Sequence, residues 1–128
     1  MLYCEHGEAG RVGVPLFPWE VPVKQPDKFY RTARWTSLRR FALSRDGLMC
    51  TECRRFGRRV DADTVHHVFP RTEFPEFQWA AWNCVSLCRG CHDTMHDRNT
   101  NALTERGVAM LKRVARQREM IVPLRYRD

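Results

Sequence analysis

Two Cys-x-x-Cys pairs constrain this chain of 128 residues more than any other feature. Cys50 and Cys53 form the first pair, and Cys88 and Cys91 form the second. A Cys-x-x-Cys turn presents two thiolates from one knuckle, and two knuckles complete the tetrahedral shell that Zn²⁺ prefers. The pairs predict a structural zinc site. The alternatives are a set of buried reduced cysteines and a dithiol redox enzyme, and the latter is weaker because neither pair lies in a βαβ pattern.

The segment between the two knuckles holds 34 residues. A plain zinc ribbon places roughly 15–20 residues there. We therefore expect the zinc to hold the base of an inserted unit. That unit contains a histidine pair, His66 and His67, and so offers chemistry beyond the zinc site.

The remaining cysteines are expected to have lesser roles. Cys4 and His6 form a lone Cys-x-His pair in a loop-like segment, which we expect to bind no metal. Cys84 lies off the knuckle register and is expected to be a small buried side chain. No charged-then-apolar leader opens the chain, so we expect a reducing, cytoplasmic location. Paired cysteines act there as metal ligands and not as disulfides.

Positive charge gathers in two stretches of the chain. Residues 31–59 carry a net charge of +7 and residues 101–128 carry +4, whereas residues 60–100 carry −3. Nineteen of the 22 basic residues are arginine, whose planar fork of donors suits phosphate. The pattern favours a nucleic-acid partner over a lipid surface, with a solvated charged surface as the alternative. No apolar run approaches the ~18 residues that a membrane span needs.

Periodicity and turn residues predict a mixture of helices and short strands. Four prolines, from Pro15 to Pro26, exclude a helix in the N-terminal segment. We expect a tight turn at Cys50–Cys53. Helices are predicted over about 28–45, 91–98 and 102–118, short strands at 59–60 and 64–69, and a helical turn within 76–83.

Five polar residues form a second constellation around the knuckles. His66 and His67 end the second predicted strand, where neighbouring side chains point to opposite faces. Asn83 follows the aromatic turn, and His92 directly follows the second knuckle. His96 lies four residues further on, the spacing at which two helical residues share a face. One histidine of the pair could therefore face a metal while the other faces a substrate.

Phosphodiester hydrolysis would use such a set. It needs an activated water, stabilisation of the charge on phosphorus-bound oxygens, and help for the departing 3′ oxygen. A neutral imidazole can take a proton from water at neutral pH, and a divalent cation can stabilise the phosphate oxygens. The alternative is that the histidines join the zinc or are hydrogen-bonded core residues.

The two knuckles and the histidines between and after them resemble the motifs of the HNH endonucleases. The resemblance covers about residues 28–98 and is greatest to the small, zinc-stapled HNH nucleases of tailed bacteriophages. It implies an α+β fold, a small ββα-metal domain with two zinc knuckles and flanking helices. The matching residues are Phe29-Tyr30, Trp35, Leu38-Arg39, Cys50-Thr51-Glu52-Cys53, Val65-His66-His67-Val68-x-Pro70 and Asn83-x-Val85-x-Leu87-Cys88-x-x-Cys91-His92.

The resemblance also implies roles for individual residues. His67 would be the general base, and His66 would bind the catalytic divalent ion at a position where the family often has aspartate. His92 would be the second ligand, and Asn83 would either fix the loop opposite or touch the metal. His96 is a possible further ligand or phosphate contact. Imidazole at position 66 favours Mn²⁺ or other transition metals over Mg²⁺, which prefers oxygen.

The implied substrate is double-stranded DNA, bound through its phosphates with low sequence specificity. The expected contacts are Arg39, Arg40, Arg54, Arg55, Arg58 and Arg59, with Arg113 and Arg116 as lesser candidates. The family implies phage DNA processing in the host cytoplasm, with the large subunit of the packaging motor (terminase) as a partner. We expect a monomer with no membrane association.

The chain is thus expected to divide into a Pro-rich arm (1–27), a zinc-stapled nuclease domain (28–98) and a basic C-terminal helix and tail (99–128). Two alternatives to an active nuclease stay open at this level. One is a catalytically silent, zinc-stabilised DNA-binding module. The other is a packaging-complex component that is active only with its partner.

Overall fold

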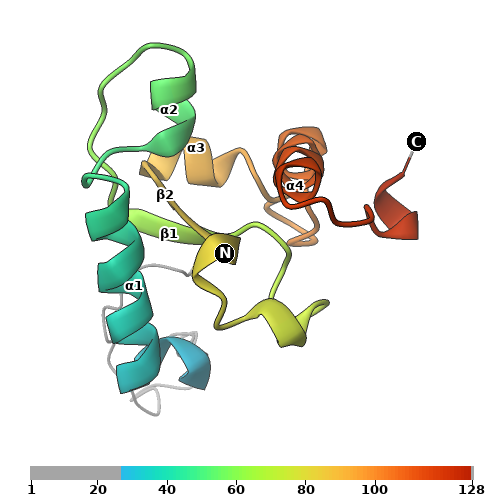
Figure 1. The fold of residues 1–128 in the computed structure, drawn as a ribbon, viewed down its shortest axis with the longest axis horizontal. Helices are drawn as coiled ribbons and strands as arrows, with labels where there is room; N and C mark the ends of the chain where they lie inside the picture. The colour runs from blue at the N-terminus through green and yellow to red at the C-terminus, as the bar shows by residue number, and fades with distance from the viewer. Residues whose placement is uncertain (1–26, 128) are drawn as a thin grey trace, which may run out of the picture.

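The computed structural model describes residues 27–127. Most of the predicted Pro-rich arm and the Cys4–His6 pair lie outside the described residues. Within the described residues, no helix is long and apolar enough to cross a bilayer. The elements form a small α+β arrangement around one two-stranded sheet (Figure 1).

The helix predicted over 28–45 consists of two elements. A 3₁₀ turn, η1 (Lys28–Arg31), precedes α1 (Ala33–Arg45). Thr32 separates them with extended backbone angles, and its hydroxyl accepts a hydrogen bond from the Trp35 amide at 3.1 Å. The same hydroxyl donates to the Phe29 carbonyl at 2.8 Å. A threonine cap therefore ends one element and starts the next, which periodicity alone does not reveal.

The first knuckle opens a helix in place of the predicted isolated turn. Cys50 caps α2 (Thr51–Arg55), and its sulphur accepts from the Cys53 amide at 3.4 Å. In place of the strand predicted at 59–60, the described residues form an isolated antiparallel bridge between Met49 and Asp61, in which the Cys50 amide donates to the Val60 carbonyl at 2.8 Å. An extended backbone contact therefore lies next to the predicted position, but it does not continue into a strand.

The sheet pairs β1 (Thr64–His67) with β2 (Cys84–Leu87) in antiparallel register. His66 lies opposite Val85, and His67 lies opposite Cys84. β1 is shorter than the predicted strand over 64–69. The predicted helical turn within 76–83 appears as two 3₁₀ turns, η2 (Pro75–Phe77) and η3 (Ala81–Asn83), and the latter leads directly into β2.

The two helices that follow the sheet are shorter than predicted. Cys88 caps α3 (Arg89–Asp93), which ends when Thr94 donates from its hydroxyl to the Cys91 carbonyl at 2.6 Å. α4 (Glu105–Gln117) begins at the Thr104 cap. Gly107 lets α4 pack closely against the segment that follows α3. A Cβ at position 107 would lie only 2.5 Å from the Met95 carbonyl oxygen.

The sheet separates two hydrophobic clusters. On one face, Val65 and Cys84 pack with Phe29, Trp35 and Ala42 against α1. On the other face, the knuckle cysteines pack with residues of β2, α3 and α4, and Figure 1 shows α1 and α4 on opposite sides of the sheet. Strand alternation sends neighbouring residues of β1 into different clusters. This geometry decides where each histidine of the pair points. A short 3₁₀ turn, η4 (Leu124–Tyr126), lies near the C-terminus.

Candidate active site

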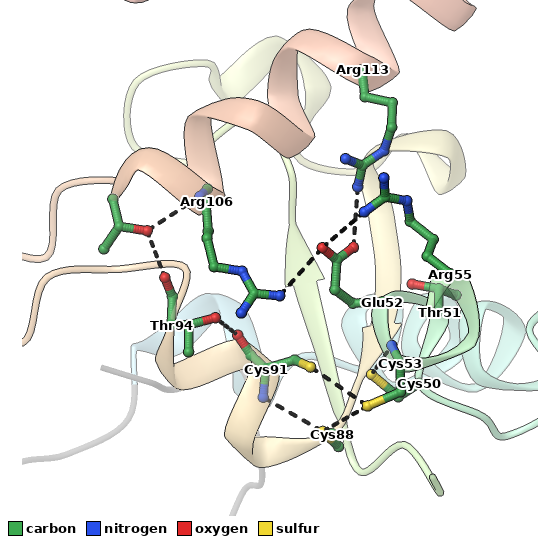
Figure 2. Close-up of polar contacts among 12 residues, drawn as sticks. Cys50, Thr51, Glu52, Cys53, Arg55, Cys88, Cys91, Thr94, Arg106 and Arg113 are labelled. Carbon is green, nitrogen blue, oxygen red and sulfur yellow. Dashed lines mark hydrogen bonds and ion pairs between the residues drawn. The ribbon is translucent and has the colours of Figure 1, made fainter. Parts of the chain in front are cut away.

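The four knuckle cysteines meet at one point, as the sequence predicts. The Cys53 sulphur lies 3.8 Å from that of Cys88 and 3.7 Å from that of Cys91 (Figure 2). A tetrahedron with Zn–S bonds of about 2.3 Å has edges of about 3.8 Å, so the spacing fits zinc. No disulfide joins these side chains, which are free thiols. The four cysteines therefore offer a closed donor set for a structural zinc ion.

Glu52, between the two cysteines of the first knuckle, ties the knuckle to α4. Its side chain is 6% exposed, and its carboxylate lies 3.1 Å from Arg113, 3.2 Å from Arg55 and 3.5 Å from Arg106 (Figure 2). A buried carboxylate needs such partners to offset its lost hydration. Two of the arginines predicted to contact DNA, Arg55 and Arg113, are thus engaged within the protein.

A second cluster brings together three imidazoles from three segments. His66 comes from β1, His92 from α3 and His96 from the turn that follows α3. One ring nitrogen from each lies within 4.8 Å of the others. The Nε2 atom of His66 is buried without a hydrogen-bond partner among the described residues. Three convergent nitrogens with an unsatisfied buried acceptor could serve as the donor set of a transition-metal site.

The charge state of the three rings suits metal binding. Burial, followed by the neighbouring imidazoles, lowers the pKa of His66 well below its ordinary value. Burial also lowers the pKa of His92, to about 3, and that of His96. His96 Nδ1 lies 3.2 Å from the Asn101 carbonyl, so it donates there and leaves Nε2 with its lone pair. Neutral imidazole is the form that binds a cation.

His67 points to the opposite face of the sheet, into a cap of four aromatic side chains that we call the aromatic cap. Its ring stacks on that of Trp35 at 5.2 Å. Its Nε2 lies 3.1 Å from the Gln78 carbonyl, whereas its Nδ1 has no partner among the described residues. Burial lowers its pKa to about 4. The aromatic cap consists of Phe29, Tyr30, Trp35 and Trp79.

Asn83 is fully buried and holds the loop after β1. Its Oδ1 accepts from the Phe69 amide at 2.7 Å, and its Nδ2 donates to the carbonyls of Phe69 at 3.1 Å and Phe77 at 3.2 Å. These bonds occupy both ends of the carboxamide. Of the two predicted roles, the geometry favours fixing the loop, and contact of Asn83 with a metal stays a prediction.

The remaining predicted DNA contacts lie on α1, α2 and the following loop, apart from Arg116 on α4. Arg39 donates to the Asp63 carbonyl at 3.0 Å, and Arg54 donates to the Asp46 carbonyl at 2.6 Å. Arg58 points to the Cys53 sulphur at 3.7 Å. The exposed arginines include Arg40, Arg59 and Arg116. Contact of these residues with DNA stays a prediction.

Comparison with known proteins agrees with this geometry. Residues 50–98 match the family model described as HNH endonuclease. This unit has the HNH fold. The chain is also similar to a crystal structure of the HNH endonuclease of the deep-sea thermophilic bacteriophage GVE2 with a manganese ion. The identity is 27%, the match covers 52% of this chain and 72% of that one, and the TM-score is 0.51. No curated protein matches the chain.

The resemblance and the α+β fold class inferred from the sequence are therefore confirmed. His96 was only a possible site residue, and the structure brings it into the histidine cluster although it lies outside α3. Its spacing from His92 carried the signal. The contact with the Gln78 carbonyl could not be predicted, because a backbone group that accepts a hydrogen bond from a side chain is independent of residue type. The paired role of Glu52 was missed because two of its partners, Arg106 and Arg113, come from α4, more than 50 residues along the chain.

Proposed function

We propose that this protein is a divalent-metal-dependent DNA endonuclease that hydrolyses phosphodiester bonds with His67 as the general base. One observation carries the proposal. Adjacent residues of β1 present an imidazole of a candidate metal cluster on one face and, on the other, an imidazole nitrogen without a hydrogen-bond partner in residues 27–127, inside an HNH fold. A binding module would have no use for the second group.

His66, His92 and His96 would hold the catalytic ion. Their three nitrogens suit Mn²⁺ and other transition metals better than Mg²⁺. The similar phage nuclease contains manganese in its crystal structure, which supports this preference. When bound, the cation supplies Lewis-acid stabilisation of charge on the phosphate and on the departing oxygen.

His67 would take the proton from the attacking water, which requires the aromatic cap to admit water to its buried Nδ1. Its low pKa keeps the ring neutral at pH 7, and donation from Nε2 to the Gln78 carbonyl leaves the lone pair on Nδ1. After proton transfer, the same carbonyl would stabilise the resulting imidazolium. Asn83 would act indirectly, by holding the loop that leads to Gln78 through its bonds to Phe69 and Phe77.

The substrate would be held through its phosphates. The exposed arginines around α1 and α2 suit a polyanion, and such contacts carry no sequence information. We therefore propose low sequence specificity. We also place the activity in phage DNA processing beside the packaging motor, on the strength of the resemblance to phage nucleases. Zn²⁺ on the four cysteines would stabilise the fold and take no part in catalysis.

A nicking assay tests the function. Supercoiled plasmid is incubated at low salt with Mg²⁺, Mn²⁺, Ni²⁺ or no added metal. We expect open circles with added metal, and most with Mn²⁺. Hydrolysis that expels the 3′ oxygen leaves a 5′-phosphate and a 3′-hydroxyl, so DNA ligase should reseal the nicks. Retarded but uncut plasmid in every metal would favour the silent binding module.

A further inference from the structure

Arg71, in the loop after β1, lies against the aromatic cap of His67. The centre of its guanidinium is 4.4 Å from the ring centroid of Phe29 and 5.3 Å from that of Tyr30. These two rings lie 5.6 Å and 6.3 Å from the imidazole of His67. One layer of aromatic rings therefore separates a fixed positive charge from the proposed general base.

The donors of Arg71 are only partly used. Its Nη2 lies 2.5 Å from Oδ2 of Asp27. Its Nε, on the same edge of the guanidinium, is buried without a hydrogen-bond partner among the described residues. Asp27 fills only one of the two positions, since its Oδ1 accepts from the Phe29 amide at 2.8 Å to cap η1. One of the two donors on this edge is therefore buried and unpaired within residues 27–127.

We propose that Arg71 binds a DNA phosphate that flanks the scissile one, and that Asp27 occupies its guanidinium only until DNA arrives. This inference rests on the proposed nuclease function. A phosphodiester has two free oxygens and can accept from both Nε and Nη2, whereas Asp27 offers one. The Asp27 side chain is 50% exposed, so water can stabilise it once it is displaced.

The sequence position of Arg71 did not indicate a role in DNA binding. It lies in the acidic stretch 60–100, outside the two basic stretches from which the DNA contacts were predicted. The aromatic cap holds its planar group in place through the rings of Phe29 and Tyr30. An arginine that is already fixed loses less conformational entropy on binding than a free surface arginine.

Duplex affinity across a salt series tests the inference. The measurements use a short labelled duplex, the His67→Ala background and no added divalent metal, so that cleavage does not interfere. Each phosphate contact contributes about 0.9 to the slope of log K against log salt. We expect Arg71→Gln to weaken binding and to lower the slope by about that amount. Asp27→Asn keeps an oxygen for the Phe29 amide, and we expect it to tighten binding.

Two variants serve as matched controls. Arg118 also stacks on a ring, with its guanidinium 4.4 Å from that of Trp82, and Arg118→Gln removes the same charge elsewhere. Glu119→Gln removes one exposed negative charge, as Asp27→Asn does. We expect Arg118→Gln to leave the slope unchanged, unlike Arg71→Gln. We expect Glu119→Gln to tighten binding less than Asp27→Asn does. Thermal melting of every variant checks that the fold is retained.

The slope separates phosphate binding from a structural role. An unchanged slope in folded Arg71→Gln would overturn the inference. Weaker binding by Asp27→Asn would also overturn it. Either result would mean that the Arg71–Asp27 ion pair serves only to stabilise the fold. If Arg71→Gln does not fold, tighter binding by Asp27→Asn beyond the Glu119→Gln control supports the inference, and its absence overturns it. Plasmid nicking by the wild type is scored separately. If the wild type nicks plasmid but Arg71→Gln leaves the slope unchanged, only the role of Arg71 is refuted. If the wild type does not nick plasmid in any metal, the proposed function is refuted.

Discussion

The imidazole Nε2 of His67 lies 3.1 Å from the backbone carbonyl oxygen of Gln78. A carbonyl oxygen can only accept, so Nε2 carries the proton and Nδ1 keeps the lone pair. The loop between β1 and β2 thereby fixes the tautomer that a general base needs. The proposed base therefore depends on the loop as much as on the histidine itself.

Replacing His67 by alanine should abolish most of the cleavage. A positioned general base contributes about 10²–10⁴-fold, so we expect a loss in that range. The rate of plasmid nicking in Mn²⁺, at equal protein concentration, measures it. Thermal melting is needed alongside, because the ring also packs on Trp35. Full activity in a folded variant would exclude His67 as the base.

Replacing His96 by alanine should weaken Mn²⁺ binding. The variant loses one of the three nitrogens that converge within 4.8 Å, and we expect the affinity to fall by at least about tenfold. Titration calorimetry on zinc-loaded protein gives the dissociation constant. His92→Ala should behave alike because the two rings share the site. Unchanged affinity in both variants would show that manganese binds elsewhere.

Replacing Cys53 by serine should remove the zinc and unfold the knuckle. A structural zinc site supplies folding energy directly, so loss of one thiolate should lower the melting temperature sharply. Cys84→Ala is the matched control, because Cys84 is also buried but lies outside the cluster. Atomic absorption should find one zinc per chain in the control and little in Cys53→Ser. Equal zinc contents would contradict the four-cysteine site.

The sequence was sufficient to predict the sites that rest on residue type and spacing. The four cysteines and the opposed faces of His66 and His67 follow from the knuckle pattern and from strand alternation. Element boundaries were less predictable, because hydrogen bonds decided them. Thr32 divides the first helix, and only an isolated bridge between Met49 and Asp61 forms near the strand predicted at 59–60.

Replacing Asn83 by aspartate should destabilise the protein without removing its zinc. The change deletes the two amide donations to Phe69 and Phe77 and sets a carboxylate oxygen against both carbonyls. We expect a loss of about 2–4 kcal/mol in the free energy of unfolding. Urea denaturation at pH 7 measures the loss. A stability equal to that of the wild type would mean that the loop is held by other contacts.

Replacing Glu52 by glutamine should loosen α4 from the knuckle. The amide keeps the shape but loses the charge that faces Arg55, Arg106 and Arg113. These arginines are 24–48% exposed, so water moderates the cost to about 1–3 kcal/mol. Glu105→Gln, an exposed acid on α4, is the control, with an expected change within about 0.5 kcal/mol. Equal effects in urea denaturation would refute the role of Glu52.

The most direct test of the account compares the wild type with His67→Ala and His66→Ala on supercoiled plasmid, with and without added Mn²⁺. Each protein is first shown to contain zinc and to be folded. The account predicts open circles only for the wild type with added metal. Equal nicking by all three folded proteins, or none by the wild type in any metal, would contradict it.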